Sequence, residues 1–267
     1  MFIIWGTKRT ARKLGFVADF CPICREPREF KLSRIGAVSH LYYISFGSGK
    51  LTGHVIECCV CGQALTADPM GYAAYEKLPG SEIGLLIQTT FPKLKEIYAE
   101  RLAAELKVRR SLKSLTQEER LKMIIEPFSL LNPAVEERFT RDTRMDKQSG
   151  IGCLGSLIVL AVLLAIAVNL REPLQGQVMT AAFILFGIGA IYTFVQLGLG
   201  PRRFLRTQIV PKIARTLDPL RPTEEELSAT LSRCKAAQMK IGQKLKLKTL
   251  WDEIQRRASI TSENPSN

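Results

Sequence analysis

Four cysteines near the start of the chain have the spacing of a tetrahedral metal site. They form two C-x2-C pairs, Cys21 with Cys24 and Cys58 with Cys61, and a strand-rich segment separates the pairs. This pattern is typical of a closed zinc site, in which four thiolates fill the coordination shell. Because no position stays open for a substrate or an activated water, the pattern predicts one structural Zn2+ and no catalytic metal.

Other ligands and another metal are alternatives at this site. Cys59 fits the pattern less well than Cys58, because only one residue separates it from Cys61. His40 and His54 are expected to be surface or packing residues. Four thiolates also suit iron, as in rubredoxin-like sites. Zinc is the favoured metal, because nothing else in the sequence points to electron transfer.

The composition indicates a reducing compartment and an anionic partner. The chain has 267 residues, seven cysteines and a formal net charge of +13. An odd number of cysteines with paired spacing argues against a disulfide framework, and thiolate ligands require reducing conditions. The apolar start, residues 1–5, is too short for a signal peptide and predicts a strand. The basic excess suits nucleic acid or the inner face of a membrane.

The first 75 residues predict a small β-rich domain around the cysteines. Residues 36–56 are mostly strand formers, with a glycine-rich turn at 47–50 and a returning strand that leads to Cys58. Each cysteine pair is therefore expected at the end of a hairpin. A domain of this size has little core, so metal binding would supply much of its folding free energy.

The opening of the chain resembles small zinc-ribbon domain proteins of microbes. The likeness rests on Phe2-Ile3-Ile4-Trp5-Gly6, a basic stretch, C-x2-C, an aromatic strand and C-x2-C-G, over residues 1–66. The resemblance implies a ribbon fold and a structural zinc, and it implies no catalytic activity. The chain departs from that family because membrane spans and helical segments follow the ribbon.

Two uncharged apolar runs, 151–168 and 178–200, predict a transmembrane helical hairpin. The connector contains Pro173 and Gly176, which favour a turn. The alternative is a pair of helices buried in a soluble domain, but the flanking segments look too polar to cover them. Neither run contains an ionisable Asp, Glu, Lys, Arg or His, which argues against a transporter or a pump.

Small residues along both runs suit close helix packing. Gly152 and Ser156 form a small-xxx-small pair in the first run, and Gly187 and Gly189 lie in the second. Such residues let helix backbones approach each other. Packing within the hairpin is the expected use, and a dimerisation face is the alternative.

Basic residues flank the hairpin on one side. The connector has only Arg171, beside Glu172, whereas six basic residues near the outer ends of the runs are predicted to contact anionic lipid head groups. These residues are Arg141, Arg144, Lys147, Arg202, Arg203 and Arg206. Since positive residues stay on the cytoplasmic side, the chain is predicted to be a multi-pass protein of the cell (inner) membrane with both termini cytoplasmic.

Helical segments flank the hairpin on both sides. Residues 92–112 have an amphipathic pattern, and Thr116 to Glu119 form a capping box that opens a helix through Ile125. Asn132-Pro133 predicts the start of a third helix, 134–146. After the hairpin, a second capping box at Thr223 to Glu226 predicts one long helix to about residue 257.

The predicted fold class is α+β, with a β-rich zinc ribbon, cytoplasmic helical segments and a two-helix transmembrane hairpin. The predicted parts are a zinc ribbon at 1–75, a cytoplasmic helical segment at 81–147, the hairpin at 151–200, a basic helical segment at 201–258 and a disordered tail at 259–267.

The function that these features predict is a membrane-anchored binding or scaffold module at the cytoplasmic face, with a protein partner. An enzyme is not expected, because the chain has only two histidines and lacks G-x-S-x-G, P-loop and H-E-x-x-H motifs. The alternative is a membrane-tethered zinc ribbon that binds nucleic acid. Basic residues surround the first cysteine pair, and Tyr42, Tyr43 and Phe46 lie nearby in sequence. These basic residues are Lys8, Arg9, Arg12, Lys13, Arg25, Arg28, Lys31 and Arg34.

Overall fold

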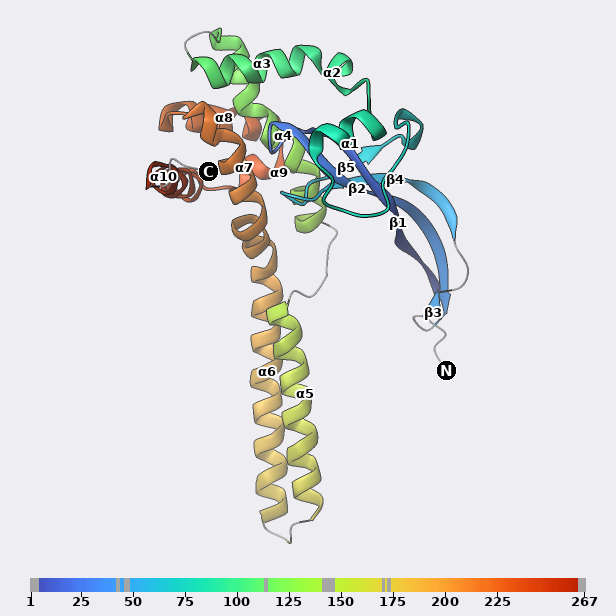
Figure 1. Cartoon of the computed structure of the whole chain (residues 1–267). Coiled ribbons are helices and arrows are strands. Elements are labelled where there is room, and N and C mark those ends of the chain that lie inside the picture. The colour runs from blue at the N-terminus through green and yellow to red at the C-terminus, as the bar shows by residue number, and fades with distance from the viewer. Residues whose placement is uncertain are drawn as a thin grey trace. The chain divides into compact units, whose positions relative to one another are not determined.

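The computed structural model describes residues 5–41, 44–45, 49–112, 115–140, 147–169, 171 and 174–263. It is an α+β structure with an antiparallel N-terminal sheet followed by helices (Figure 1). The chain divides into two units. Unit 1 consists of Met1–Pro127 and Lys212–Pro222, and unit 2 consists of Phe128–Pro211 and Thr223–Asn267. We call Lys212–Pro222 the return segment, because it comes back to unit 1 from a distant part of the chain.

An antiparallel sheet forms the first part of unit 1. Its strand order is β1-β2-β4-β5, and the two-residue strand β3 pairs with β2. The strands are β1 (Trp5–Cys21), β2 (Glu26–Leu41), β3 (Ile44–Ser45), β4 (Lys50–Cys58) and β5 (Ala64–Ala67). The predicted strands are confirmed in the described part of 36–56, although β2 begins ten residues earlier, directly after the first cysteine pair. Residues 1–4 of the predicted opening strand, and residues 46–48 around the predicted turn, lie outside the described residues.

Short helices cover one end of the sheet in unit 1. They are η1 (Pro69–Gly71), α1 (Ile83–Thr90), α2 (Leu94–Ile97) and α3 (Ala99–Arg110). Ala18, Leu86, Phe91 and Leu94 form a buried apolar cluster between β1 and these helices. The Thr90 hydroxyl accepts a hydrogen bond from the Ala18 N–H at 2.9 Å, which ties the end of α1 to β1. The single amphipathic helix predicted at 92–112 is divided into α2 and α3 at Tyr98.

The helix start predicted at Asn132-Pro133 is wrong, because α4 (Gln117–Thr140) runs through both residues. The Asn132 side chain is used elsewhere: its Oδ1 accepts the Ile241 N–H at the beginning of α9 (Lys240–Lys244), at 3.1 Å. Phe128, Leu131 and Val135 are fully or almost fully buried on one helical face. Burial of that face outweighs the usual cost of proline inside a helix, about 3 kcal/mol.

Both predicted capping boxes are present. The Glu119 N–H donates to Thr116 Oγ1 at 3.2 Å while Glu119 Oε2 accepts the Thr116 N–H at 2.9 Å, and Thr223 and Glu226 repeat this pair of bonds. The long helix predicted after Thr223 is instead three helices, α8 (Glu224–Ala236), α9 and α10 (Leu247–Glu263). The break after α8 coincides with Gln238, whose φ of 58° is left-handed. Helix α10 extends to Glu263, into the segment predicted to be a disordered tail.

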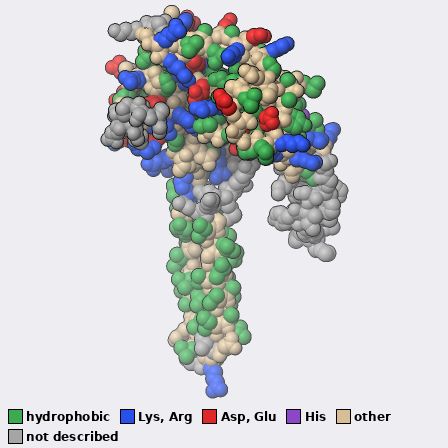
Figure 2. Space-filling model, in the orientation of Figure 1, with side chains coloured by type: hydrophobic (Ala, Val, Ile, Leu, Met, Phe, Trp, Pro, Cys, Tyr) green, Lys and Arg blue, Asp and Glu red, His purple; other side chains and the backbone are tan. Residues whose placement is uncertain are grey.

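Two helices of unit 2 are long and apolar enough to cross a membrane. They are α5 (Lys147–Val168) and α6 (Leu174–Phe204), and they pack side by side (Figure 1). Each begins a few residues before the predicted span, and α6 also ends a few residues later. Large apolar side chains cover the surface of the pair (Figure 2). Ile151, Phe183, Ile191 and Phe194 are each more than half exposed, so the chain does not bury these two helices in a soluble core.

Small residues hold the two helices together. A Cβ added to Gly189 would clash with Ser156 Cβ, and one added to Gly152 would lie 3.0 Å from the Tyr192 ring. A Cβ added to Gly187 would have no neighbour within 4 Å. Gly152, Ser156 and Gly189 therefore serve packing within the hairpin.

Gly189→Leu is expected to loosen this hairpin, whereas Gly187→Leu is not. A leucine at 189 must displace Ser156, and overpacking of this kind costs about 1–3 kcal/mol. Unfolding by SDS in mixed micelles, followed by circular dichroism, measures the difference between the two variants. Equal stability of the two variants would show that the Gly189–Ser156 approach does not hold the helices together.

Candidate metal centre

The four predicted cysteines come from two neighbouring turns of the sheet. Cys21 is the last residue of β1, and Cys24 lies in the turn that leads into β2. Cys58 is the last residue of β4, and Cys61 lies in the turn before β5. Since β2 pairs with both β1 and β4, it places the two turns side by side. We call residues 21–25 the first knuckle and residues 58–62 the second knuckle.

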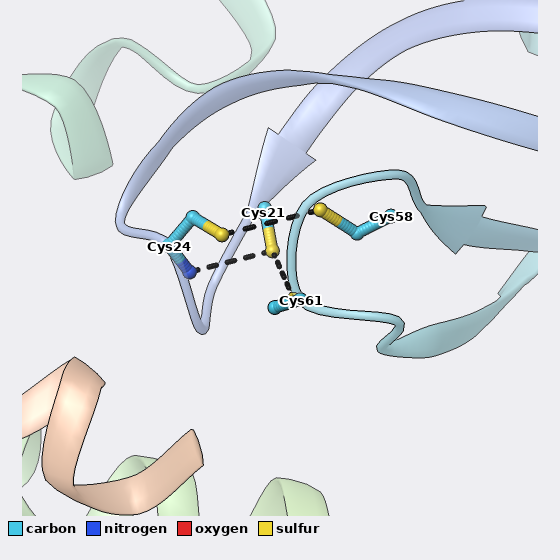
Figure 3. A group of neighbouring side chains, drawn as sticks. All are labelled: Cys21, Cys24, Cys58 and Cys61. Atoms are coloured by element: carbon cyan, nitrogen blue, oxygen red, sulfur yellow. Dashed lines mark hydrogen bonds between the residues drawn. The ribbon is translucent and has the colours of Figure 1, made fainter. Parts of the chain in front are cut away.

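The four sulfurs converge, as the spacing predicts (Figure 3). They all lie within 4.8 Å of one another. The Sγ atoms of Cys21 and Cys61 are 3.5 Å apart, and those of Cys24 and Cys58 are 4.0 Å apart. A tetrahedron with metal–sulfur bonds of about 2.3 Å has edges of about 3.8 Å, so this group of sulfurs has the size of one metal ion's coordination shell.

The two knuckles have the same backbone conformation. The Arg25 N–H donates to the Cys21 carbonyl at 2.7 Å, and the Gly62 N–H donates to the Cys58 carbonyl at 2.8 Å. Arg25 and Gly62, each directly after the second cysteine of its pair, have left-handed φ angles of 62° and 65°. Glycine adopts this conformation easily, whereas arginine does so rarely. In the second knuckle, Gly62 therefore predicts the left-handed position from the sequence. In the first knuckle only the two cysteines indicate a turn.

The close approach of the four sulfurs shifts the pKa values of their thiols in opposite directions. Close contacts with Cys24, Cys58 and Cys61 raise the pKa of the Cys21 thiol above its usual range. Contacts with Cys21 and Cys24 lower the pKa of Cys58 below its usual range and that of Cys61 to about 7. Four negative sulfurs this close would repel one another, so they can all be thiolates only around a positive ion.

Arg25 connects the first knuckle to the rest of unit 1. Its guanidinium is 4% exposed, and its Nε lies 2.7 Å from Glu105 Oε2 on α3, which is 6% exposed. The same guanidinium donates to the Thr216 carbonyl at 3.2 Å and contacts Met123 Sδ at 3.5 Å. Arg25 thus combines a left-handed backbone with a buried ion pair to α3. Sequence reasoning missed it, because Arg25 was expected to be a basic surface residue.

Two of the alternative ligands, Cys59 and His54, lie outside the sulfur cluster. Cys59 is exposed, and its N–H donates to the Glu29 carbonyl at 3.0 Å. His54 lies in β4, opposite Arg34 of β2 and Ala67 of β5, away from the knuckles. The side chain of His40 lies outside the described residues.

The predicted basic surfaces are described in part. Arg141 and Arg144 lie outside the described residues, and of Lys147 only the backbone, at the start of α5, is described. Arg202 and Arg203 are in the last turn of α6, and Arg206 is in the π-helical turn η3 (Leu205–Ile209). Of the basic residues near the first knuckle, Arg25 is buried, Arg28 pairs with Glu26 and Lys31 pairs with Glu57. The described residues do not include Tyr42, Tyr43 and Phe46. Of Lys8 and Arg9 only the backbone is described.

The four cysteines thus form a group in the described chain that could hold a metal ion. They lie in unit 1, which also includes the return segment. Comparison with family models, with curated proteins and with solved structures finds no match to this chain.

Proposed function

We propose that this protein is a membrane-anchored zinc-ribbon protein that acts as a binding or scaffold module at the cytoplasmic face of the membrane. The observation that carries the proposal is the closed group of four cysteine sulfurs in a chain that also has an exposed apolar hairpin. A site of this kind stabilises a fold and leaves no ligand position for a reaction.

The donor set supports zinc as the metal. Cys21, Cys24, Cys58 and Cys61 would be its ligands, with four sulfurs and no carboxylate or imidazole in the group. The Cys24 N–H lies 3.4 Å from Cys21 Sγ and stabilises negative charge on that sulfur. Iron also accepts four thiolates, so metal analysis of the purified protein distinguishes the two metals.

The surface of the hairpin supports a place in the bilayer. Exposed Ile, Leu, Val and Phe side chains cover α5 and α6, and exposed apolar surface on this scale needs a lipid or protein partner (Figure 2). Arg202 and Arg203 lie in the last turn of the second helix and Arg206 follows it, whereas the connector has Arg171 as its single basic residue. The positive-inside rule then places both termini in the cytoplasm, where the knuckle cysteines stay reduced.

We expect the connector between α5 and α6 to be accessible from outside the cell. In intact cells, Gln175→Cys, at the connector end of α6, should react with a membrane-impermeant maleimide. Ser228→Cys, at an exposed position of α8, is the matched probe of the opposite side and should react only after lysis. Cys59 is an exposed thiol of the chain itself and is replaced by serine in both variants. Labelling of Ser228→Cys but not Gln175→Cys in intact cells would reverse the proposed orientation.

The scaffold role is tested by cross-linking and mass spectrometry on the full-length protein in its native membrane. The matched control is the full-length Cys58→Ser/Cys61→Ser variant, which retains the hairpin but loses two metal ligands. Protein partners that cross-link to the natural chain and not to this variant support a role for the metal-held sheet. Recovery of the same partners with both chains, or of none, contradicts it.

Nucleic-acid binding has less support than the scaffold role. Arg25 is buried against Glu105, and Arg28 and Lys31 already pair with carboxylates, so these three residues are not available to phosphates without loss of those pairs. Titration of the full-length protein with oligonucleotides at several salt concentrations tests this alternative, since phosphate contacts weaken as salt rises.

A further inference from the structure

The return segment is buried in unit 1, although it lies far along the chain from the sheet. It contains most of α7 (Val210–Leu217) and the 3-10 turn η4 (Asp218–Leu220). Ile213, Ala214, Leu217 and Leu220 have no exposed surface. The chain reaches this segment from α6 through η3, with helical residues throughout from Leu174 to Leu220. The apolar helix α6 is therefore followed directly by a segment that belongs to the sheet unit.

The return segment contacts the second knuckle through Lys212. The Lys212 Nζ donates to the Gly62 carbonyl at 3.3 Å and to Gln63 Oε1 at 3.4 Å. Gly62 directly follows the ligand Cys61, and its left-handed conformation sets the direction of its carbonyl. A change in the second knuckle therefore moves the acceptor of this bond.

The return segment contacts the first knuckle through Thr216, one helical turn further on. The buried Thr216 hydroxyl lies 3.0 Å from the Ile23 carbonyl and 2.9 Å from the Lys212 carbonyl one turn back, and these two acceptors share its single proton. The Thr216 carbonyl accepts from Arg25 at 3.2 Å. Ile23 lies between the ligands Cys21 and Cys24, and its side chain is fully buried. The contacts with Ile23 and Arg25 both use knuckle residues whose backbone is constrained when the neighbouring cysteines hold a metal.

We propose that the metal centre is a clasp that holds the return segment on the sheet. Metal binding to the four cysteines fixes the Ile23 and Gly62 carbonyls, and these carbonyls fix Thr216 and Lys212. Loss of the metal frees both acceptors and releases the return segment from the sheet. The inference rests on the proposed structural metal. It adds that the presence or loss of this metal controls whether the return segment stays docked on the sheet.

Limited trypsin digestion of the full-length protein in detergent tests the clasp. Trypsin cleaves after lysine and arginine, and the bonds Lys212–Ile213 and Arg215–Thr216 lie in the docked segment. We expect both bonds to resist cleavage in the zinc-loaded protein and to be cut after zinc is removed with a chelator. Hydrogen exchange of β2 and β4 shows whether the sheet itself unfolds when zinc is removed, and α8, which lies in unit 2, is the control for loss of fold elsewhere.

A pair of threonine variants separates the clasp from simple unfolding of a metal-free protein. Thr216→Val keeps the side-chain shape but removes the hydroxyl that the Ile23 and Lys212 carbonyls share, so with zinc bound we expect cleavage at both bonds to rise on the order of tenfold. Thr207→Val is the matched control, because the Thr207 hydroxyl is exposed and donates only to the Arg203 carbonyl one turn back, at 2.9 Å. Its cleavage rate should equal that of the natural protein.

The outcomes distinguish the clasp from the proposed function. Protein purified without a stoichiometric metal overturns the proposed structural metal, whatever the protease shows. Protein that binds zinc, but keeps both bonds protected after chelation and in Thr216→Val, retains its structural metal and overturns the clasp. The clasp and the structural metal are both supported if zinc protects the two bonds, Thr216→Val weakens that protection and Thr207→Val leaves it intact.

Discussion

Cys58→Ser is expected to abolish metal binding and to unfold the sheet of unit 1 in the full-length protein. Cys58 is 1% exposed and supplies one of the four sulfurs. Structural zinc contributes about 10–16 kcal/mol to the folding of zinc-finger peptides, which is as large as the whole stability of most domains, roughly 5–15 kcal/mol. Loss of a contribution this large is therefore expected to unfold the sheet.

Cys59→Ser is the matched control for this prediction, because Cys59 is the next residue, is exposed and lies outside the sulfur group. Metal content by mass spectrometry and hydrogen exchange of β2 and β4 measure both variants. Cys59→Ser should keep one metal per chain and the protection of the natural protein. A Cys58→Ser variant that retains metal and a protected sheet would falsify the four-cysteine site.

Glu105→Ala is expected to destabilise unit 1 by about 3–5 kcal/mol, because it leaves the Arg25 guanidinium buried without its carboxylate partner and also removes the ion pair of Glu105 with Arg101. Chemical unfolding of the zinc-loaded protein in detergent, followed by intrinsic fluorescence and hydrogen exchange, measures the loss. The double variant Arg25→Ala/Glu105→Ala should lose less than the sum of the two single variants, because the two side chains form one interaction.

Arg109→Ala provides the comparison within the same helix. Arg109 also pairs with a glutamate, Glu26, at 3.2 Å, but the arginine side chain is 60% exposed. Exposed ion pairs contribute about 0–1 kcal/mol, so this variant should be nearly as stable as the natural protein. Similar losses for Glu105→Ala and Arg109→Ala would mean that burial of the Arg25–Glu105 pair does not matter.

The features that sequence predicts well here depend on residues close together in the chain. The cysteine pairs, both capping boxes and the uncharged runs each occupy a short segment, and each lies where its local pattern indicates. Leu227, Leu231 and Cys234 have helical spacing and are all buried along α8. Convergence of the four sulfurs is a longer-range prediction that succeeds, because metal-ligand spacing implies spatial contact.

The features that sequence did not predict depend on partners far away in the chain. Arg25 meets Glu105 80 positions later and Thr216 191 positions later, and no local pattern marks either partner. Asn132 has the local pattern of a helix start, but its side chain caps a backbone N–H 109 positions away. At Arg25 and Asn132, tertiary burial and hydrogen bonding outweigh the local sequence pattern. The pattern alone therefore predicts the wrong surroundings for these two side chains.

The discontinuity of unit 1 has a consequence for how the protein is made. A ribosome delivers the sheet first and the return segment only after both apolar helices, so Ile23 and Arg25 remain uncovered while more than half of the chain is synthesised. During that interval the contacts of Arg25 are formed at most in part, because Thr216 does not yet exist. Synthesis of the hairpin therefore precedes completion of the domain that stands before it in the sequence, and an unfinished chain exposes an apolar surface that chaperones can bind.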